Sequence, residues 1–462
     1  MRREIAWCCW DICVYEQRGC GYDDGEMQTR AMGNSVSRRF FLASSLGAAV
    51  VLKRGGTLLA QAAADTDEPW TVEERLLPAV PITRGPKQHF FGYYDKQQFD
   101  TGNRHLLGLE CSVIGRLQQP DDVAVIGMVD IARNHRWTPL VETRAWNWQM
   151  GCHAEWLPGQ PRRIIFNDRR EGQLVAVIRD LDSKRETVLP RPIFTVAHDG
   201  RWGVSLNFAR LWRYRPETGF CGVQDPWDGQ AAPAEDGLFR VDFGTGKSAL
   251  IVSHKDMAAF RPPNAKEGAW YFTHVSVNED GSRLLFWYRL AARTGAFQSA
   301  VYTADVDGGN IHLVANHNSH TVWLGRDNIL AWLGRGPHGA HFYLCRDKSN
   351  ELRVVGGNKL NANGHALYSP DRRWLLTDRP LNKANERTLV IADLARRHCC
   401  DIGRFAEMTE LKGPLRCDLH ARWNRDGTAI CFDSTHENSR QMYLVDVSSV
   451  VRPSQQRKES TT

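Results

Sequence analysis

One phrase recurs seven times in this sequence and constrains the fold more than any other feature. In its fullest form it reads His420-Ala-Arg-Trp-Asn-Arg-Asp426-Gly427-Thr-Ala-Ile-Cys-Phe: an apolar segment, an Asp-Gly turn and a second apolar run. Asp-Gly adopts tight-turn geometry at low cost, so we expect the two apolar runs to pair as antiparallel strands. The seven turns lie near residues 100, 159, 199, 280, 326, 371 and 426.

The spacing of these turns indicates the architecture. Most intervals are about 40 to 60 residues, the size of one four-stranded propeller blade. Seven such units fill residues 75–450 without linkers, which argues against a row of separate β-sandwiches. The longest interval holds an insertion, residues 210–236, rich in Pro, Gly and aromatic residues. We therefore predict an all-β fold, a seven-bladed β-propeller with four-stranded antiparallel blades.

Composition narrows the range of partners. The chain has 462 residues, of which 42% are hydrophobic and 24% charged, as in an ordinary globular protein. The formal net charge of +6 is a mild excess that favours acidic ligands. No run of five or six like charges marks a nucleic-acid tail, so we expect no nucleic-acid partner. We expect a monomer.

The N-terminal region carries an export signal. Residues 37–42 read Ser-Arg-Arg-Phe-Phe-Leu, the twin-arginine signature. The apolar stretch that follows, to Leu52, is too short to span a membrane, and Ala60-Gln61-Ala62 is a cleavage-type sequence. We assign residues 32–64 to a twin-arginine signal peptide, recognised by the twin-arginine export machinery and leaving no stable membrane span after cleavage. The mature protein would be periplasmic or secreted.

The two ends of the chain are interpreted separately. Residues 1–31 do not resemble the start of a signal peptide, whereas Met32 begins one of normal length. We therefore expect translation to start at Met32 and residues 1–31 to be an upstream extension. Residues 451–462 are polar and are expected to form a disordered tail.

Five histidines share one position in the repeat. Each lies six residues before its turn: His153, His274, His320, His365 and His420. The same position holds Tyr94 in the first unit and Ile193 in the third. This position opens the innermost strand of a blade, so the five side chains are expected to converge on the central channel.

A convergent set of histidines has two interpretations. Neutral imidazoles supply ring nitrogens to a divalent metal and act as acids or bases near neutral pH. In the other interpretation, each histidine is a structural latch that hydrogen-bonds to a neighbouring blade.

Polar and aromatic residues cluster beside the same positions. One group lies in the segment from His89 to Lys96, and another runs from Arg144 through Trp146, Asn147 and Gln149 to His153. Asn167 follows the next strand, and Arg210 opens the insertion. Side chains of these kinds are typical of surfaces that face carbohydrate, although packing between blades would also account for them.

Two resemblances rest on these motifs. The Ser369-Pro370-Asp371 turn resembles the TolB-like propeller repeat, over nearly all of the mature chain. The segments at 90–100 and 144–151 look like those of seven-bladed propeller polysaccharide lyases, of the oligogalacturonate lyase and ulvan lyase type. The second resemblance implies β-elimination in uronate-containing glycans, with an acidic oligo- or polysaccharide as partner.

The resemblance to the lyases implies a role for each residue. His153 and Tyr94 are the candidate base and acid, with His274 as a further candidate, and Arg210 is the candidate that neutralises the uronate carboxylate. His320, His365 and His420 are candidate ligands of a divalent metal such as Mn, Ca or Zn. The candidate substrate-binding residues are His89, Arg144, Trp146, Asn147, Gln149 and Asn167.

The alternative is a non-catalytic TolB-like propeller that serves as a binding or scaffold protein. It predicts latch histidines and no stoichiometric metal. The sequence favours the lyase without excluding a hydrolase or the scaffold.

Overall fold

The computed structural model describes residues 69–262, 265–291 and 298–452. The predicted upstream extension and signal peptide, residues 1–64, lie outside the described residues, as does nearly all of the predicted tail. None of the helices in the described ranges is long and apolar enough to cross a membrane.

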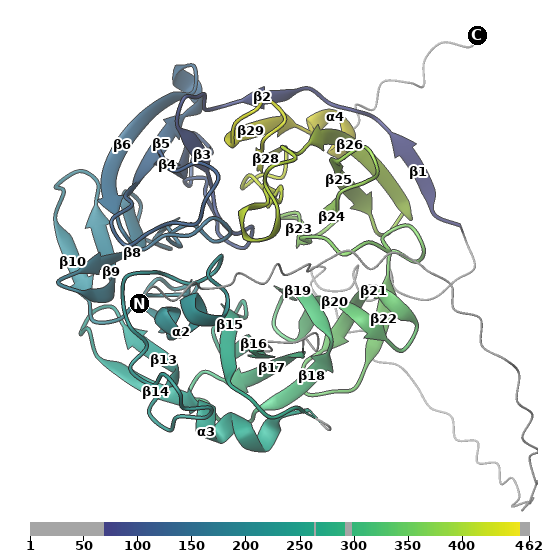
Figure 1. The fold of residues 1–462 in the computed structure, drawn as a ribbon. Helices are drawn as coiled ribbons and strands as arrows, with labels where there is room; N and C mark the ends of the chain where they lie inside the picture. Colours follow the sequence, from purple (N-terminus) through teal and green to yellow (C-terminus); the bar gives the residue numbers. More distant parts are fainter. Residues whose placement is uncertain (1–68, 263–264, 292–297, 453–462) are drawn as a thin grey trace, which may run out of the picture. The chain divides into compact units, whose positions relative to one another are not determined.

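Seven sheets surround a central axis, as predicted (Figure 1). We number the blades in chain order, with strands from the axis outward. Blades 1 to 3 consist of β3 (Gln88–Phe90), β4 (His105–Cys111), β5 (Ala124–Asp130) and β6 (Arg136–Thr143); β7 (Glu155–Trp156), β8 (Arg163–Arg170), β9 (Gln173–Asp180) and β10 (Glu186–Leu189); and β11 (Thr195–Val196), β12 (Trp202–Ser205), β13 (Gly237–Asp242) and β14 (Ser248–Ser253).

Blades 4 to 7 repeat the same order. They consist of β15 (Trp270–Val277), β16 (Arg283–Leu290), β17 (Ser299–Asp305) and β18 (His312–Asn316); β19 (Asn318–Leu324), β20 (Asn328–Gly336), β21 (Gly339–Arg346) and β22 (Leu352–Val355); β23 (Leu367–Tyr368), β24 (Trp374–Arg379), β25 (Glu386–Asp393) and β26 (His398–Ala406); and β27 (Arg422–Trp423), β28 (Ala429–Ser434) and β29 (Gln441–Asp446), completed by β2 (Ala79–Pro81).

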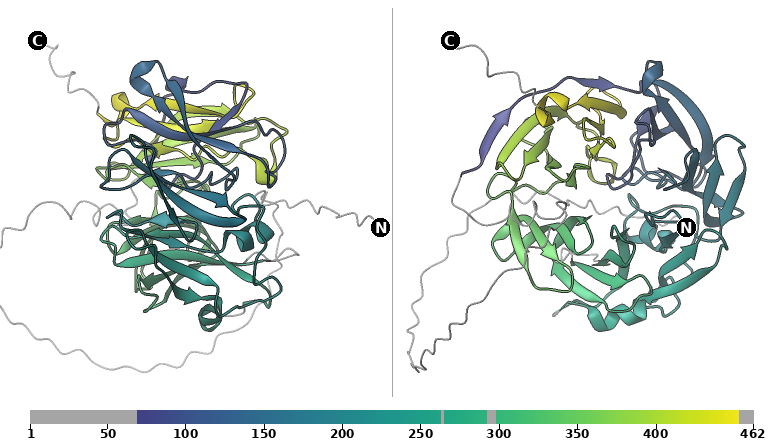
Figure 2. Two further views of the ribbon diagram at one scale, coloured as in Figure 1. Left: turned by 90° about the vertical axis from the view of Figure 1, so that its left-hand side faces the viewer. Right: turned by 180° about the vertical axis from the view of Figure 1, so that it is seen from behind.

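The N-terminal segment closes the ring. Strand β2 pairs antiparallel with β29 and supplies the outer strand of blade 7, so the two ends of the propeller share one sheet. Figure 2 shows the N-terminal strands beside the last blades when the ring is seen from behind. Strand β1 (Thr71–Glu74) pairs parallel with β26, which gives blade 6 a fifth strand that the repeat did not predict.

Each predicted turn joins the innermost strand of a blade to its second strand. The second and third strands have buried centres, and β16 and β25 are buried along nearly their whole length, because both of their faces pack against neighbouring blades. The cores therefore lie between sheets; one extends over blades 3 and 4 and another over blades 6 and 7. All eight cysteines of the described residues are free and buried.

One inner strand makes a large excursion toward the axis. Phe90 pairs with Leu109 and Phe99 with Leu106, so residues 91–98 are opposed only by Leu107 and Gly108. The surplus residues form a loop, which we call the tyrosine loop because it carries Tyr93 and Tyr94. The Asp433 carboxylate in blade 7 accepts the N–H of Phe91 at 2.9 Å and anchors the start of this loop.

The insertion lies at the edge where the inner strands begin. Because the second strand runs back toward that edge, its connection to the third strand emerges there. In blade 3 this connection is residues 206–236, which include helix α2 (Phe208–Tyr214). The remaining helices are short: α3 (His254–Met257), α4 (Ser448–Val451), and the 3₁₀ turns η1 (Ile131–Arg133), η2 (Ala258–Phe260) and η3 (Gly413–Leu415).

A core substitution tests the inter-blade packing. Leu376 in β24 is fully buried, so Leu376→Ala removes apolar contacts and leaves a cavity. We expect it to lower the free energy of unfolding in urea by about 2–5 kcal/mol. The matched change Leu381→Ala, at a side chain 41% exposed in the same blade, should cost less than about 0.5 kcal/mol. Equal losses would contradict the described packing.

A second prediction concerns the anchor of the tyrosine loop. Burial raises the pKa of Asp433 to about 7, despite the opposing charge of Arg422. The folded state therefore retains this proton to higher pH than the unfolded chain, in which the pKa of Asp is about 4. As a result, the free energy of unfolding should fall by up to about 1.4 kcal/mol per pH unit between about pH 4 and 7. Asp433→Asn should remove that contribution.

The measurement is urea unfolding of both proteins at pH values from 5 to 8. The variant should gain stability relative to the parent as pH rises to about 7 and then show a constant difference. A difference that does not change over this range would contradict the assigned titration.

Candidate metal and catalytic site

An unusual backbone conformation directs the histidines toward the axis. His153, His274, His320 and His420 have φ angles of 55°, 50°, 43° and 42°. Positive φ is uncommon in residues other than glycine, although His is enriched among the exceptions. At His274 and His320 the pairing with the second strand shifts register, so the histidine is an extra residue in a β-bulge. Bulges re-aim side chains, and such conformations concentrate at functional sites.

Four of the five histidines gather around the tyrosine loop. The rings of His320 and His365 are 4.1 Å apart between centroids, and those of His365 and His420 are 4.5 Å apart. His274 joins the group through Tyr93, whose ring lies 5.0 Å from it and 5.1 Å from His420. We call these four residues the histidine cluster.

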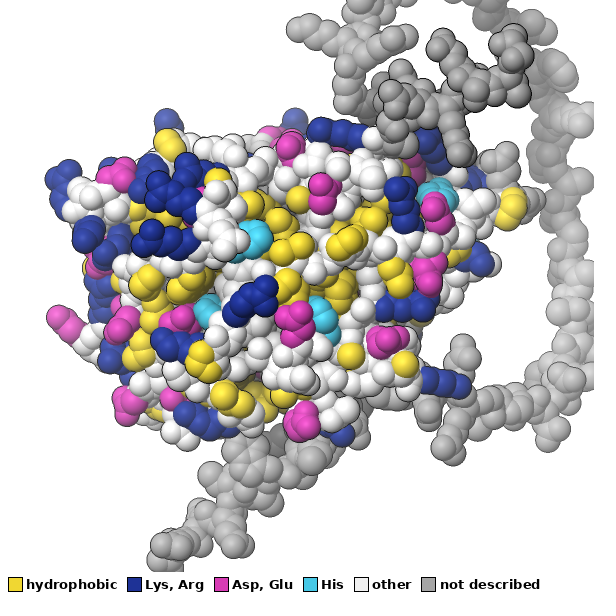
Figure 3. Space-filling view, turned by 90° about the horizontal axis from the view of Figure 1, so that it is seen from above, with side chains coloured by type: hydrophobic (Ala, Val, Ile, Leu, Met, Phe, Trp, Pro, Cys, Tyr) yellow, Lys and Arg dark blue, Asp and Glu magenta, His cyan; other side chains and the backbone are white. Residues whose placement is uncertain are grey.

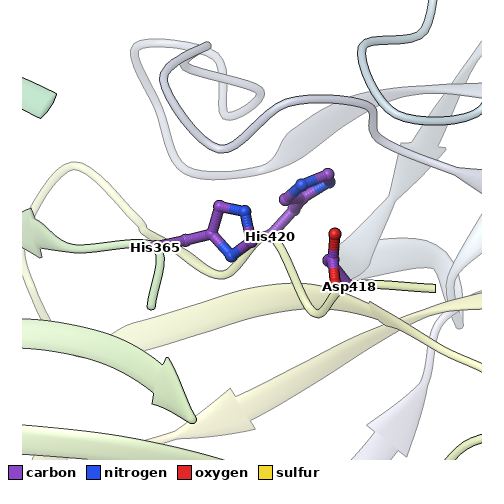
Figure 4. A group of neighbouring side chains, drawn as sticks. All are labelled: His365, Asp418 and His420. Carbon is purple, nitrogen blue, oxygen red and sulfur yellow. The ribbon is translucent and has the colours of Figure 1, made fainter. Parts of the chain in front are cut away.

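Three side chains of this region fit a metal ion. One potential ligand atom from each of His365, Asp418 and His420 lies within 4.8 Å of the other two, and all three side chains are buried. Figure 4 shows the three side chains as neighbours, with His420 between His365 and Asp418. Two imidazole nitrogens and one carboxylate oxygen form a donor set that suits Mn²⁺ or Zn²⁺.

Hydrogen bonds orient two of the rings. Nδ1 of His365 lies 3.0 Å from the Asp378 carboxylate, which also accepts the His365 backbone N–H at 2.7 Å. A carboxylate only accepts, so Nδ1 donates and Nε2 keeps the lone pair that a metal requires. In the same way, Nδ1 of His320 donates to Asn363 Oδ1 at 2.8 Å, which leaves its Nε2 as an acceptor.

The protonation states also suit a metal. Burial lowers the pKa of His420 and of His320 well below the usual value, so both rings are neutral near pH 7. Burial by itself would raise the pKa of Asp418, but Arg416 and Arg387 hold it well below its usual range. Arg416 and Arg387 pair with the Asp418 carboxylate at 2.7 and 3.0 Å. The site therefore presents the neutral ring of His420 and the ionised carboxylate of Asp418.

An unpartnered atom supports the same interpretation. His420 Nε2 is buried and makes no hydrogen bond within the described part of the chain. Buried polar atoms are nearly always paired, so each exception requires an explanation. A ligand bound at the cluster would provide the missing partner.

His153 occupies a separate pocket. Its ring packs against Phe194 at 4.6 Å and Phe208 at 5.3 Å, and its Nδ1 lies 3.1 Å from the Phe194 carbonyl oxygen in the next blade. Phe194 lies between it and His274, at 6.3 Å from the latter ring. The five histidines predicted to converge thus form a cluster of four, with His153 to one side. Nε2 of His153 is also buried and has no partner among the described residues.

Both tyrosines of the tyrosine loop face the cluster. The Tyr94 ring lies 5.0 Å from His365, and the rings of Tyr93 and Tyr94 are 4.6 Å apart. Burial raises the pKa of each phenol far above its usual value, so both remain protonated. Tyr94 was predicted here; its neighbour Tyr93 was not.

Buried cations flank the cluster. Arg289 in β16 lies over the Trp287 ring at 4.4 Å, and Trp287 stacks on His274 with centroids 3.7 Å apart. Burial lowers the pKa of Arg289 to about 10, and the neighbouring Arg215 acts in the same direction, so Arg289 is still charged at pH 7. A cation placed beside neutral histidines attracts an anionic group.

Arg210, the residue predicted to neutralise a carboxylate, has a different position. It is fully buried, and its guanidinium donates to the carbonyl oxygens of Trp270 and Gln230 at 3.1 and 3.0 Å. Its Nη1 also lies 3.4 Å from the Asp225 carboxylate. These partners belong to the insertion and blade 4, so the side chain braces the insertion. The arginine beside His274 is Arg289, whose Nε donates to Ser299 Oγ at 3.1 Å.

The predicted substrate-binding residues mostly contact other parts of the protein. Asn167 donates to the carbonyl oxygen of Ile193 at 2.8 Å and accepts its backbone N–H at 2.7 Å. Ile193 occupies the histidine position of the third repeat. Gln149 donates to the carbonyl oxygen of Arg416 and supports the loop that carries Asp418. Only Arg144 is exposed.

The remaining three stabilise the region where blades 1, 2 and 7 meet. His89 lies 2.9 Å from Gln441 Oε1 and 3.2 Å from Glu110. The Trp146 indole donates to the Asp122 carbonyl, and Asn147 accepts the backbone N–H of Met150 at 2.7 Å. These side chains are buried and each makes a hydrogen bond, although Nδ2 of Asn147 has no partner among the described residues.

Sequence reasoning missed Asp418, Asp378, Asn363 and Arg289. Asp418 lies two residues before His420, so an Asp-x-His spacing was visible in the sequence. Asn363 lies at the equivalent position, two residues before His365, whereas no local pattern links Asp378 and Arg289 to the histidines.

Comparisons with known proteins agree with the fold. An oligogalacturonate lyase solved in complex with manganese is 15% identical, with 80% of this chain and 93% of that chain covered and a TM-score of 0.59. An oligogalacturonate lyase from Vibrio parahaemolyticus is 14% identical, with 80% and 94% covered and a TM-score of 0.56. TolB from Acinetobacter baumannii is 11% identical, with 60% and 58% covered and a TM-score of 0.34.

No protein-family profile and no curated protein sequence matches the chain. At these identities the structural likeness concerns the fold alone. The chain therefore has the seven-bladed propeller fold of the oligogalacturonate lyases.

Proposed function

We propose that this protein is a polysaccharide lyase that cleaves uronate-containing glycans by β-elimination and uses a divalent metal, with manganese as the first candidate. The proposal rests on one observation: potential metal ligands, protonated tyrosines and a buried arginine lie close together at the propeller axis. The manganese complex of a lyase with this fold supports the choice of metal.

The metal would be held by His365, His420 and Asp418, with His320 beside them. When bound, it supplies a Lewis acid that offsets the charge of a uronate carboxylate and so acidifies the neighbouring C–H group. Arg289 adds a second positive charge on the side of His274.

The chain's own residues supply the proton transfers. The neutral ring of His274 removes the proton from the carbon next to the carboxylate; burial lowers the pKa of this ring well below its usual value, so it is free to accept. As the C–H electron pair forms a carbon–carbon double bond, the bond to the leaving oxygen breaks. The tyrosine pair then protonates that oxygen, and exchange with water restores both groups. His153 is the alternative base, buried in its aromatic pocket.

The cellular setting is part of the proposal. The twin-arginine signal would deliver the folded protein to the periplasm or beyond, where acidic glycans are accessible to it. The insertion, at the edge of the ring where the histidines lie, would contribute one wall of the substrate channel.

A second candidate is a metal-free binding propeller with latch histidines. It is favoured by two hydrogen bonds between adjacent blades, from His153 to the Phe194 carbonyl and from His320 to Asn363. The unpartnered Nε2 atoms of His153 and His420 favour the lyase. A latch uses only one ring nitrogen and leaves the second one buried without a partner, whereas a bound metal or substrate would supply that partner.

Metal binding tests the first part of the proposal. Titration of the metal-free protein with Mn²⁺ in a calorimeter should give one site per chain. His420→Ala should weaken binding by about 100-fold or more, and Asp378→Asn by about 10- to 100-fold because it removes the group that orients His365. His338→Ala, at an exposed histidine, is the control and should bind normally. Equal binding by all four proteins would exclude the assigned ligands.

Turnover tests the second part. With polygalacturonate and Mn²⁺, we expect ultraviolet absorbance from the unsaturated product. Tyr94→Phe should lower kcat by about 100-fold or more while Mn²⁺ affinity is retained, since it removes a proton donor but no ligand. Tyr443→Phe, whose hydroxyl contacts Glu437 in blade 7, should not change kcat. Protein that binds Mn²⁺ yet leaves a panel of uronate glycans unchanged would contradict the lyase proposal.

The pH profile tests the protonation state of the base, and substitution identifies which histidine it is. Burial lowers the pKa of His274. The protein should therefore lose activity on acidification only below about pH 6.5, the ordinary pKa of histidine. His274→Ala should abolish turnover, whereas His153→Ala should retain it; the reverse result would assign the base to His153.

A further inference from the structure

A second basic feature lies far from the histidine cluster. At the edge of blades 1 and 2, a pocket of about 370 Å³ is bordered by four arginines, Arg104, Arg133, Arg136 and Arg162, together with His105 and Asp130. We call it the arginine pocket. Figure 3 shows Lys and Arg side chains crowded on the side of the ring where Figure 1 places β6.

The strand register builds this pocket. His105 in β4 pairs with Asp130 in β5, which pairs with Arg136 in β6, so the three residues form one row across the sheet. Side chains directly opposite each other on neighbouring strands share a face. Arg162 approaches from the turn that joins β7 and β8 of the next blade.

One buried carboxylate orients the basic groups. Asp130 accepts Nε and Nη2 of Arg104 at 3.0 and 2.8 Å, and Arg133 Nε lies 3.7 Å from the same carboxylate. The Asp130 side chain is 11% exposed, so most of its surface is covered by these neighbours. A fixed anion beneath two guanidinium groups holds them at the pocket wall without neutralising all four arginines.

Charge remains available for a ligand. Arg162 pairs with Asp182, whereas Arg136 is exposed and makes no side-chain hydrogen bond or ion pair within the described residues. Arg133 is 66% exposed and only loosely paired. The guanidinium fork matches a carboxylate in two-point geometry, and a row of arginines therefore suits a chain that carries a carboxylate on each unit.

The position of the pocket excludes a role in the chemistry described above. Arg104 and His105 lie at the start of β4 and Asp130 at the end of β5, which is the edge opposite to that where the histidines begin the inner strands. A ligand at this edge would be held by the protein without reaching the axis.

We propose that the arginine pocket is a non-catalytic binding site for the carboxylates of an acidic oligosaccharide, which retains a polymeric ligand on the protein. The choice of ligand rests on the proposed function, whereas the anionic character rests on the pocket itself.

The test uses trigalacturonate as probe and calorimetry at low salt. Arg133→Ala/Arg136→Ala should weaken binding at one of two sites by about tenfold or more, because two charge-assisted contacts are lost. The matched control is Arg346→Ala/Arg353→Ala, which removes two exposed arginines from the same edge of blade 5. It should bind the probe like the parent protein, and thermal melts should show that both variants are folded.

The outcomes separate this proposal from the proposed function. If Arg133→Ala/Arg136→Ala binds like the parent, or if the control loses as much affinity, the arginine pocket is not a site. If His365→Ala/His420→Ala abolishes all binding while the arginine variant loses none, the probe binds only at the axis. If no turnover occurs but the arginine variant still weakens binding, the lyase proposal fails and the arginine pocket stands.

Discussion

Closure of the ring is the constraint on which the rest of this structure depends. The pairing of β2 with β29 joins the two ends of the propeller in one sheet, and seven sheets then point their innermost strands at one axis. Whatever residue opens each inner strand is thereby brought near its six counterparts. A repeat that places histidine at that position thus creates a site from residues as far apart in sequence as His274 and His420 without any local motif.

The fold could be predicted because its signal is periodic. The Asp-Gly and Pro-Asp turns recur at blade spacing, and each of them proved to join the first and second strands of a blade. The fifth strand of blade 6 escaped prediction because β1 contains only four residues and none is buried. The tyrosine loop escaped as well: Tyr94 was placed by its offset, but the surplus residues between Phe90 and Phe99 are visible only once the pairing with β4 is known.

The site was predictable where it follows the repeat and not where it depends on tertiary partners. His320, His365 and His420 were assigned from their common offset, and they do lie together. Arg210 was assigned to the site through the resemblance to the lyases, yet carbonyl oxygens of the folded insertion and of Trp270 occupy its donors. Asn167 was expected to face substrate and instead bonds to Ile193, where the repeat lacks its histidine. Such competition between backbone and ligand for one side chain cannot be deduced from composition or spacing.

Burial explains why the cluster is chemically poised. Removing imidazoles from water favours their neutral form, and a buried carboxylate stays ionised only because Arg416 and Arg387 compensate it. Within the described residues, Nε2 of His420 is buried and has no hydrogen-bond partner. A divalent cation bound there would satisfy that atom, draw on the ionised Asp418 and account for the orientation that Asp378 imposes on His365.

The most direct test is a crystal structure of the protein grown with Mn²⁺, with anomalous diffraction data collected at the manganese edge. We expect one strong anomalous peak on the propeller axis, within bonding distance of ring nitrogens of His365 and His420 and of the Asp418 carboxylate. No peak at the axis, with the His420 Nε2 atom still unpartnered or bonded only to protein, would contradict the metal site and leave the histidines as latches between blades.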